Sequence, residues 1–146
     1  MIKEKTPITK YLCDSVFTQK PSVFADQADF CTAAHIEMPT KDAKQLGMAE
    51  NLVIEEFKEW VNEEKFGLNS NLNDLKEVID LIYVCAQYLN FQVGAEKAES
   101  LWRVVHQHNM SKMNNGKIKK RKDGKVLKPA GFDKWAWIKE FERVLD

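Results

Sequence analysis

Two stretches of the sequence each carry acidic residues that repeat at helical spacing. Glu55, Glu56 and Glu59 stand together in the first stretch, and Glu77 and Asp80 stand three positions apart in the second. At about 100° per residue, the three glutamates share an arc of roughly 100° on a helix, and Glu77 lies about 60° from Asp80. Each stretch can therefore direct its carboxylates toward one point.

Apolar residues border both acidic stretches. Leu52, Val53 and Trp60 flank the first, and Leu81 and Val84 flank the second. Carboxylates held beside a core repel one another and lose hydration, so they are unstable unless they are protonated or bridged by cations. Oxygen ligands favour magnesium, manganese or calcium over zinc or copper. The acids therefore predict a site for a hard divalent cation.

Two other interpretations of these acids remain open. Glu and Lys are common on exposed helices, so the residues from Glu55 to Glu64 could form a solvated face with Lys58 and Lys65 as partners. A di-iron carboxylate bundle requires Glu-x-x-His on paired helices, whereas Asp80 follows Glu77 at that spacing. A metal site is favoured because acidic pairs with apolar borders occur on two neighbouring predicted helices.

A lysine-rich segment follows nearer the C-terminal end. It has one acid, Asp123, and few aromatic residues. Such a tract is often a solubilising hairpin or a nucleic-acid arm, but the scarcity of aromatic residues weakens the case for base stacking. Beside an acidic metal cluster, its simplest role is to neutralise a polyphosphate that magnesium holds from the other side. The basic residues of this segment are Lys112, Lys117, Lys119, Lys120, Arg121, Lys122, Lys125 and Lys128.

The hydrophobic pattern predicts helices separated by short connections. Apolar residues recur every three or four positions, and the segment 72–90 is apolar around most of its circumference. Thr40 is expected to cap the second helix, which Gly47 could divide, and Asn71 with Asp74 resembles a capping arrangement for the third. These features favour an all-α bundle of about four to five helices. The expected helices cover residues 21–37, 40–65, 72–90, 94–113 and 132–145.

Two segments fall outside this helical pattern. Asp123-Gly124 between RK and KV predicts a type I′ turn, so we expect a small C-terminal β-hairpin or basic loop. Residues 1–20 show no clean period and are interrupted by proline, which favours an irregular N-terminal arm.

Length and composition favour one soluble domain, spanning residues 1–146. The 22 basic and 22 acidic residues cancel, so no overall field attracts the chain to nucleic acid or to an anionic membrane. The three cysteines form no C-x-x-C pair, which is typical of reduced thiols. No apolar signal segment and no run of about 18 apolar residues is present. We therefore expect a cytoplasmic protein.

Together the acidic and basic segments resemble a known family. Glu55-Glu56-x-x-Glu59 followed by Glu77-x-x-Asp80 resembles the signature of the MazG-like all-α nucleoside triphosphate pyrophosphohydrolase superfamily. The tail VHQHNMSKMNNGKIKKRKDGKVLKPAGF is similar to the C-terminal segment of its phosphoribosyl-ATP pyrophosphohydrolase-type branch, often found in phages and bacteria. The resemblance covers roughly residues 24–132.

This resemblance implies a homodimer or homotetramer that cleaves a nucleoside triphosphate between its α and β phosphates, releasing the monophosphate and pyrophosphate. It implies that Glu55 orients or deprotonates the attacking water. The implied cofactor is magnesium, with manganese as a substitute. The implied metal ligands are Glu56, Glu59, Glu77 and Asp80.

The resemblance also assigns substrate contacts. Asn109 and Lys112 match positions that contact nucleotide, and they share a helix face at i, i+3. Arg121, Lys125 and Lys128 fall in a segment that matches a phosphate-covering loop. Two alternatives stay open, namely hydrolysis of phosphoribosyl-ATP and a non-catalytic helical module that binds nucleic acid through residues 112–128.

Overall fold

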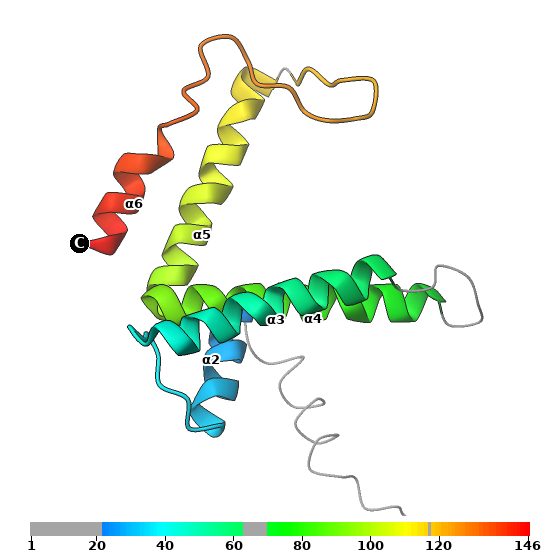
Figure 1. The fold of residues 1–146 in the computed structure, drawn as a ribbon. Helices are drawn as coiled ribbons and strands as arrows, with labels where there is room; N and C mark the ends of the chain where they lie inside the picture. The colour runs from blue at the N-terminus through cyan, green and yellow to red at the C-terminus, as the bar shows by residue number, and fades with distance from the viewer. Residues whose placement is uncertain (1–21, 63–69, 117) are drawn as a thin grey trace, which may run out of the picture.

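The computed structural model describes residues 22–62, 70–116 and 118–146, and most of these residues are helical (Figure 1). The predicted all-α fold is confirmed, and the described residues contain no strand. The predicted N-terminal arm, residues 1–20, lies outside the described residues. The elements are α2 (Val23–Ala33), α3 (Ala43–Asn62), α4 (Ser70–Val93), α5 (Ala95–Met110), the 3-10 helix η1 (Ser111–Gly116) and α6 (Trp137–Leu145).

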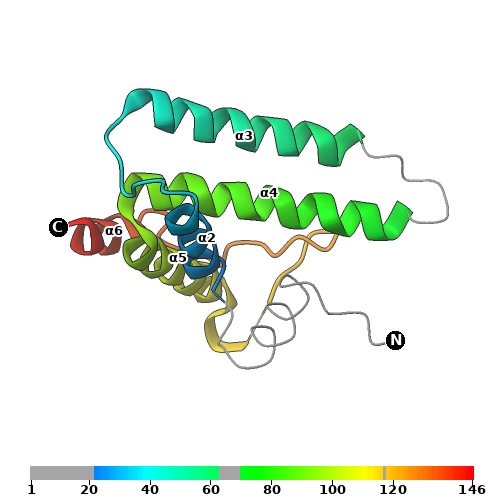
Figure 2. The same cartoon turned by 90° about the horizontal axis from the view of Figure 1, so that it is seen from below.

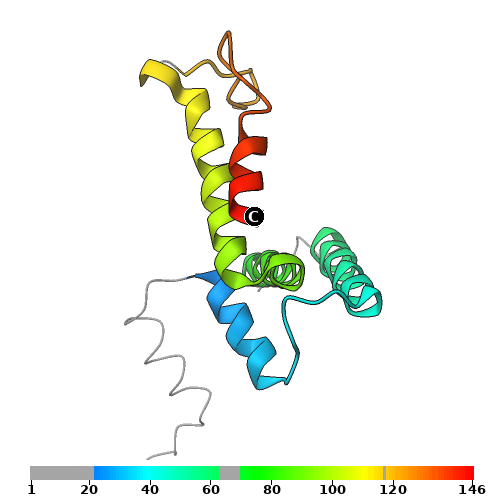
Figure 3. The ribbon, with the colours of Figure 1, turned by 90° about the vertical axis from the view of Figure 1, so that its left-hand side faces the viewer.

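The helices form two arms that meet at the end of α4. α3 and α4 lie side by side and run in opposite directions, as Figure 2 shows. α2 packs against α4 near the junction with α5. α5 then leaves in a different direction, and α6 packs back along it (Figures 1 and 3). One arm is therefore built by the helices before Gly94, and the other by the helices after it.

Capping groups set the ends of the N-terminal helices, and they differ from the prediction. α2 begins after Ser22, whose hydroxyl accepts a hydrogen bond from the amide of Ala25 at 3.3 Å. It ends before the predicted residue 37 because His35 has a φ of 56°, in the left-handed region. The amide of Ile36 then donates to the Cys31 carbonyl at 2.8 Å, which closes the last turn.

The predicted cap of the next helix, Thr40, was wrong by two residues. Asp42 takes that role, because its carboxylate accepts from the Lys44 amide at 2.9 Å and its carbonyl from the Leu46 amide at 3.0 Å. The Thr40 amide instead donates to the Phe91 carbonyl of α4 at 2.8 Å. Gly47 does not divide α3, which runs unbroken through it. The cost of one glycine, about 1 kcal/mol, does not end a helix of this length.

α4 begins earlier and ends later than predicted. Asn71, the expected cap, lies inside the helix, which starts at Ser70 and continues to Val93. Gly94 ends it with a φ of 81°, and its amide donates to the Asn90 carbonyl at 2.8 Å. α5 starts at the next residue, so this glycine sets the change of direction between the two arms.

The C-terminal segment forms the predicted small hairpin, with a different turn. Lys120 and Val126 form an antiparallel bridge, and the Arg121 amide donates to the Lys125 carbonyl at 2.8 Å. The Gly124 amide donates to the Arg121 carbonyl at 2.9 Å, and Gly124 has a φ of 86°. This geometry matches a three-residue loop with a glycine bulge rather than a two-residue type I′ turn.

The C-terminal helix is shorter than predicted. α6 begins at Trp137 and not at Phe132, because the Asp133 carboxylate accepts from the Trp135 amide at 2.9 Å and holds a turn there. Phe132 packs instead on His108, with ring centroids 4.9 Å apart. No helix in the described part of the chain is long and apolar enough to cross a membrane.

A buried polar contact joins α2 to α4 at the junction. Asn90 is fully buried, and its side-chain amide donates to the Phe24 carbonyl at 2.9 Å and to Gln27 Oε1 at 2.7 Å. The Gln27 amide in turn contacts Cys31 Sγ at 3.0 Å. Small apolar clusters lie beside these residues, one containing Phe24, Ala86 and Ala98 and the other containing Cys31, Ala49 and Phe91.

We expect Asn90→Ala to destabilise the fold. The change leaves the Phe24 carbonyl and Gln27 Oε1 buried without their donor, but it also removes Asn90 Oδ1, for which the described residues provide no hydrogen bond. The expected loss is about 1–3 kcal/mol in the free energy of unfolding, measured by urea denaturation. Gln92→Ala, at an exposed position of the same helix, should change it by less than about 0.5 kcal/mol. Equal effects of the two changes would contradict this role.

Candidate metal centre

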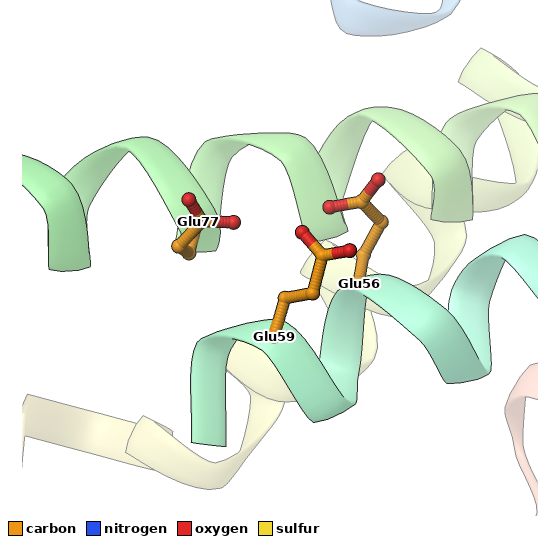
Figure 4. Close-up of side chains that lie close together, drawn as sticks. All are labelled: Glu56, Glu59 and Glu77. Atoms are coloured by element: carbon orange, nitrogen blue, oxygen red, sulfur yellow. The ribbon is translucent and has the colours of Figure 1, made fainter. Parts of the chain in front are cut away.

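Pairing of α3 with α4 brings acidic residues from both helices together. Glu56, Glu59 and Glu77 each offer a carboxylate oxygen, and these oxygens lie within 4.8 Å of one another. Figure 4 shows the Glu56 and Glu59 carboxylates projecting from α3 toward α4, which carries Glu77. We call these three residues the acidic triad. It joins the two predicted acidic stretches at one place.

The acidic triad is partly withdrawn from water. Glu77 is 9% exposed, Glu56 is half-buried and Glu59 is exposed. The Oε2 atoms of Glu56 and Glu77 are buried, and the described residues give neither atom a hydrogen-bond partner. Buried carboxylate oxygens without donors are costly, and a cation is the kind of partner that removes the cost. The exposed side, at Glu59, leaves a route for solvent and ligands.

The predicted apolar border is also present. Val84 is buried, and Leu52, Val53, Trp60 and Leu81 are half-buried. Such surroundings weaken the hydration of the neighbouring carboxylates.

Burial and mutual repulsion act on Glu56 in particular. Burial raises the pKa of the Glu56 carboxyl, and the negative charges of Glu59, Asp80 and Glu77 raise it further. The Lys76 ammonium partly offsets this rise in the pKa. Four carboxylates thus interact electrostatically, although only three of them form the acidic triad.

Lys76 is the residue that the sequence analysis missed. Its Nζ lies 2.7 Å from Asp80 Oδ2 and 3.1 Å from Glu77 Oε1, while 63% of its side chain is exposed. The hydrogen bond to Asp80, and to a smaller extent the one to Glu77, raise the pKa of Lys76, which therefore stays charged. The i, i+4 spacing of Lys76 and Asp80 is visible in the sequence and is typical of helical ion pairs.

Two of the predicted residues lie at the edge of the group. Asp80 is outside the acidic triad and is held by Lys76, but it is close enough to raise the pKa of Glu56. Glu55 is exposed and also lies outside the triad. Of the three acids expected to converge from α3, the structure brings Glu56 and Glu59 together with Glu77.

The predicted substrate residues lie in the other arm of the molecule. Lys112 Nζ donates to Asn109 Oδ1 at 2.7 Å, so these two side chains meet as expected. Arg121 is already paired with Asp123, to which its Nε donates at 2.9 Å. Figures 1 and 3 place this segment at the far end of α5 from the α3–α4 pair.

The remaining predicted contacts are also in this far segment. Lys125 and Lys128 are both exposed, and Lys128 Nζ lies 5.7 Å from the centre of the Phe132 ring. Within one chain, the structure therefore does not bring the predicted phosphate contacts to the acids.

Chemically, the acidic triad offers hard oxygen ligands from two helices, with one side open. This arrangement suits a divalent cation that keeps free positions for water or an anionic ligand. Comparison with known proteins adds no further guide, since no family model and no curated protein matches the chain.

The raised pKa of Glu56 gives an expected pH dependence. The folded metal-free protein binds this proton more tightly than the unfolded chain does, whose glutamates have a pKa of about 4.3. This group therefore favours folding at low pH, and the benefit is lost as the pH rises from about 4.3 through the raised value.

Glu56→Gln should accordingly stabilise the metal-free protein at pH 7, because the amide carries no charge for the neighbouring carboxylates to repel. We expect a gain of a few tenths to about 1 kcal/mol, because partial exposure screens the repulsion. Urea denaturation in the presence of a chelator at pH 7 and pH 4 measures it, and the gain should shrink at pH 4. Glu55→Gln, outside the triad, is the matched control. A gain equal in the two variants would contradict this account.

Proposed function

We propose that this protein hydrolyses a nucleoside triphosphate to the monophosphate and pyrophosphate with magnesium as cofactor. The observation that carries the proposal is the acidic triad with its two buried, unpartnered carboxylate oxygens, on Glu56 and Glu77. The resemblance of Glu55-Glu56-x-x-Glu59 and Glu77-x-x-Asp80 to the MazG-like signature supports it. Manganese is expected to substitute for magnesium.

In this proposal the residues divide their roles between the two helices. Glu56, Glu59 and Glu77 would hold the cation, and Asp80 would join them once Lys76 releases it. The cation would neutralise the phosphates and make the α-phosphorus more electrophilic. Glu55, exposed at the edge, would orient the attacking water and accept its proton. Water oxygen bonds to the α-phosphorus, the bond from that phosphorus to the bridging oxygen breaks, and pyrophosphate leaves.

We also propose that the chain self-associates, as a homodimer or homotetramer. The segment 72–90, which is apolar around most of its circumference, leaves a row of α4 side chains 50–66% exposed. A row on α3 is exposed to a similar degree. Large exposed apolar residues at helical spacing are typical of interfaces. The residues are Leu72, Leu75, Ile79 and Ile82 on α4, and Ile54, Phe57 and Val61 on α3.

A second copy would also bear on the predicted phosphate contacts. The C-terminal end of α5, η1 and the hairpin carry these contacts and lie far from the α3–α4 pair of their own chain, so a neighbouring chain is one source of them. A cytoplasmic location is part of the proposal, and the free thiols of Cys31 and Cys85 suit a reducing compartment.

The proposed function predicts that Glu59→Gln abolishes pyrophosphate release while the helical fold persists. The amide keeps the size of the side chain but removes a ligand charge, so a rate loss of about a hundredfold or more is expected. Release is measured over a panel of ribo- and deoxyribonucleoside triphosphates with and without magnesium, and circular dichroism checks the fold. Glu142→Gln, at an exposed position of α6, is the matched control. Wild-type rates in Glu59→Gln would exclude the proposed site.

The same panel separates the two alternative functions. Phosphoribosyl-ATP added beside the nucleotides tests hydrolysis of that compound. A nucleic-acid-binding module would instead show steeply salt-dependent binding to nucleic acid and no magnesium-dependent hydrolysis.

Self-association predicts that Ile79→Gln shifts the protein toward monomer. The change places an amide in the exposed apolar row of α4, where it would be desolvated on association. We expect the dissociation constant from analytical ultracentrifugation to rise about tenfold or more, which is about 1.4 kcal/mol. Leu145→Gln, at an exposed apolar position of α6, should leave the dissociation constant unchanged. A wild-type chain that is monomeric at high concentration would refute self-association.

A further inference from the structure

Lys76 already places a cation on two of the proposed metal ligands. Its ammonium contacts Glu77 Oε1 at 3.1 Å and Asp80 Oδ2 at 2.7 Å, and these are the two acids that α4 contributes. The side chain is 63% exposed and reaches the carboxylates from the solvent side. An ammonium carries three donors on a flexible stem, so it can occupy such a position and leave it at small cost.

Lys76 also acts on the α3 side of the group. Among the described residues, the positive charge of Lys76 lowers the pKa of Glu56. The negative charges of Glu59, Asp80 and Glu77 raise it. The predicted phosphate cations that the structure describes are elsewhere, since η1 and the hairpin that follows it lie at the far end of α5. Within the described part of the chain, Lys76 therefore provides a positive charge at the acids.

We propose that Lys76 is the displaceable counter-ion of this centre, and that the ammonium then binds the polyphosphate of the substrate. A divalent cation competes with the ammonium for Glu77 and Asp80, because both cations bind carboxylate oxygens of these two residues. Once displaced, the ammonium stays on the turn of α4 that carries the ligands, within the length of one lysine side chain of any anion bound there. The proposal rests on the proposed function, whose metal centre it describes.

An ordinary surface ion pair predicts something different. Exposed i, i+4 pairs contribute little to the stability of a helix and have no bearing on metal or phosphate binding. A displaceable counter-ion and an ordinary ion pair therefore differ in one measurable respect. Removing the ammonium changes the affinity for the divalent cation and for polyphosphate only in the first case.

The first experiment measures binding of Mn²⁺ alone to the full chain at low ionic strength by titration calorimetry. Lys76→Gln should bind Mn²⁺ about three- to tenfold more tightly than wild type, because the competing ammonium is gone from two carboxylates. Lys76→Arg keeps a competing charge and should bind Mn²⁺ near the wild-type level. Lys58→Gln removes an exposed charge from the facing helix and controls for the change in net charge.

The second experiment adds inorganic tripolyphosphate at saturating Mn²⁺, so that the identity of the nucleoside does not matter. Lys76→Gln should bind tripolyphosphate about tenfold more weakly, the effect of one lost charge-assisted hydrogen bond, and Lys76→Arg should restore most of the affinity. Lys58→Gln should bind it as wild type does.

The outcomes separate this proposal from the proposed function. A wild-type chain that binds no Mn²⁺ overturns both. Wild-type binding of Mn²⁺ with equal or weaker binding by Lys76→Gln overturns the counter-ion role alone. Tighter Mn²⁺ binding without any change in tripolyphosphate affinity overturns the phosphate role and supports the counter-ion role.

Discussion

The antiparallel pairing of α3 with α4 is the contact on which the candidate site depends. Neither helix alone can gather the acidic triad, because Glu56 and Glu59 come from one helix and Glu77 from the other. The pairing is held at the end away from the acids, where the Thr40 amide donates to the Phe91 carbonyl and Ala49 packs with Phe91. The stabilising contacts and the repelling charges are thus at different places along the same pair of helices.

This separation explains how the fold tolerates the acids. Carboxylates with buried, unpartnered oxygens oppose folding, so the contacts that offset them must lie elsewhere. α2 supplies part of them through Asn90, which joins it to α4 near the junction of the two arms. A cation bound to the folded chain would add stability by mass action, in proportion to its concentration relative to the dissociation constant. The same buried, unpartnered carboxylate oxygens therefore oppose folding and provide the ligands of the proposed metal centre.

Much of the helical fold and the two acidic stretches could be predicted from periodicity, because the spacing of Glu56 and Glu59 on one helix, and of Glu77 and Asp80 on the next, is a local property. The helix ends were harder, since they depend on single groups such as the Asp42 carboxylate and the left-handed backbone of His35. The place of the basic segment could not be predicted, because it depends on the direction in which α5 leaves Gly94. That direction depends on the positive φ of Gly94 and on the packing of α2 against both α4 and α5, neither of which hydrophobic periodicity reveals.

The distance between the two charged segments changes what each must do. A triphosphate brings about four negative charges to an acidic group, so a bound divalent cation needs further positive charge nearby. The sequence predicts that residues 112–128 supply it, but within one chain the described residues of this segment lie at the far end of α5. Among the described residues Lys76 is one source, a neighbouring copy is another, and they are not exclusive. Lys76 requires no assembly, since its ammonium already lies against Glu77 and Asp80, whereas the basic segment requires the exposed apolar rows of α3 and α4 to be covered by another chain in a suitable orientation. In the proposed function, an acidic centre with its own lysine would bind metal and polyphosphate before any assembly contributes, and an assembly would then add charge to a site that is already formed.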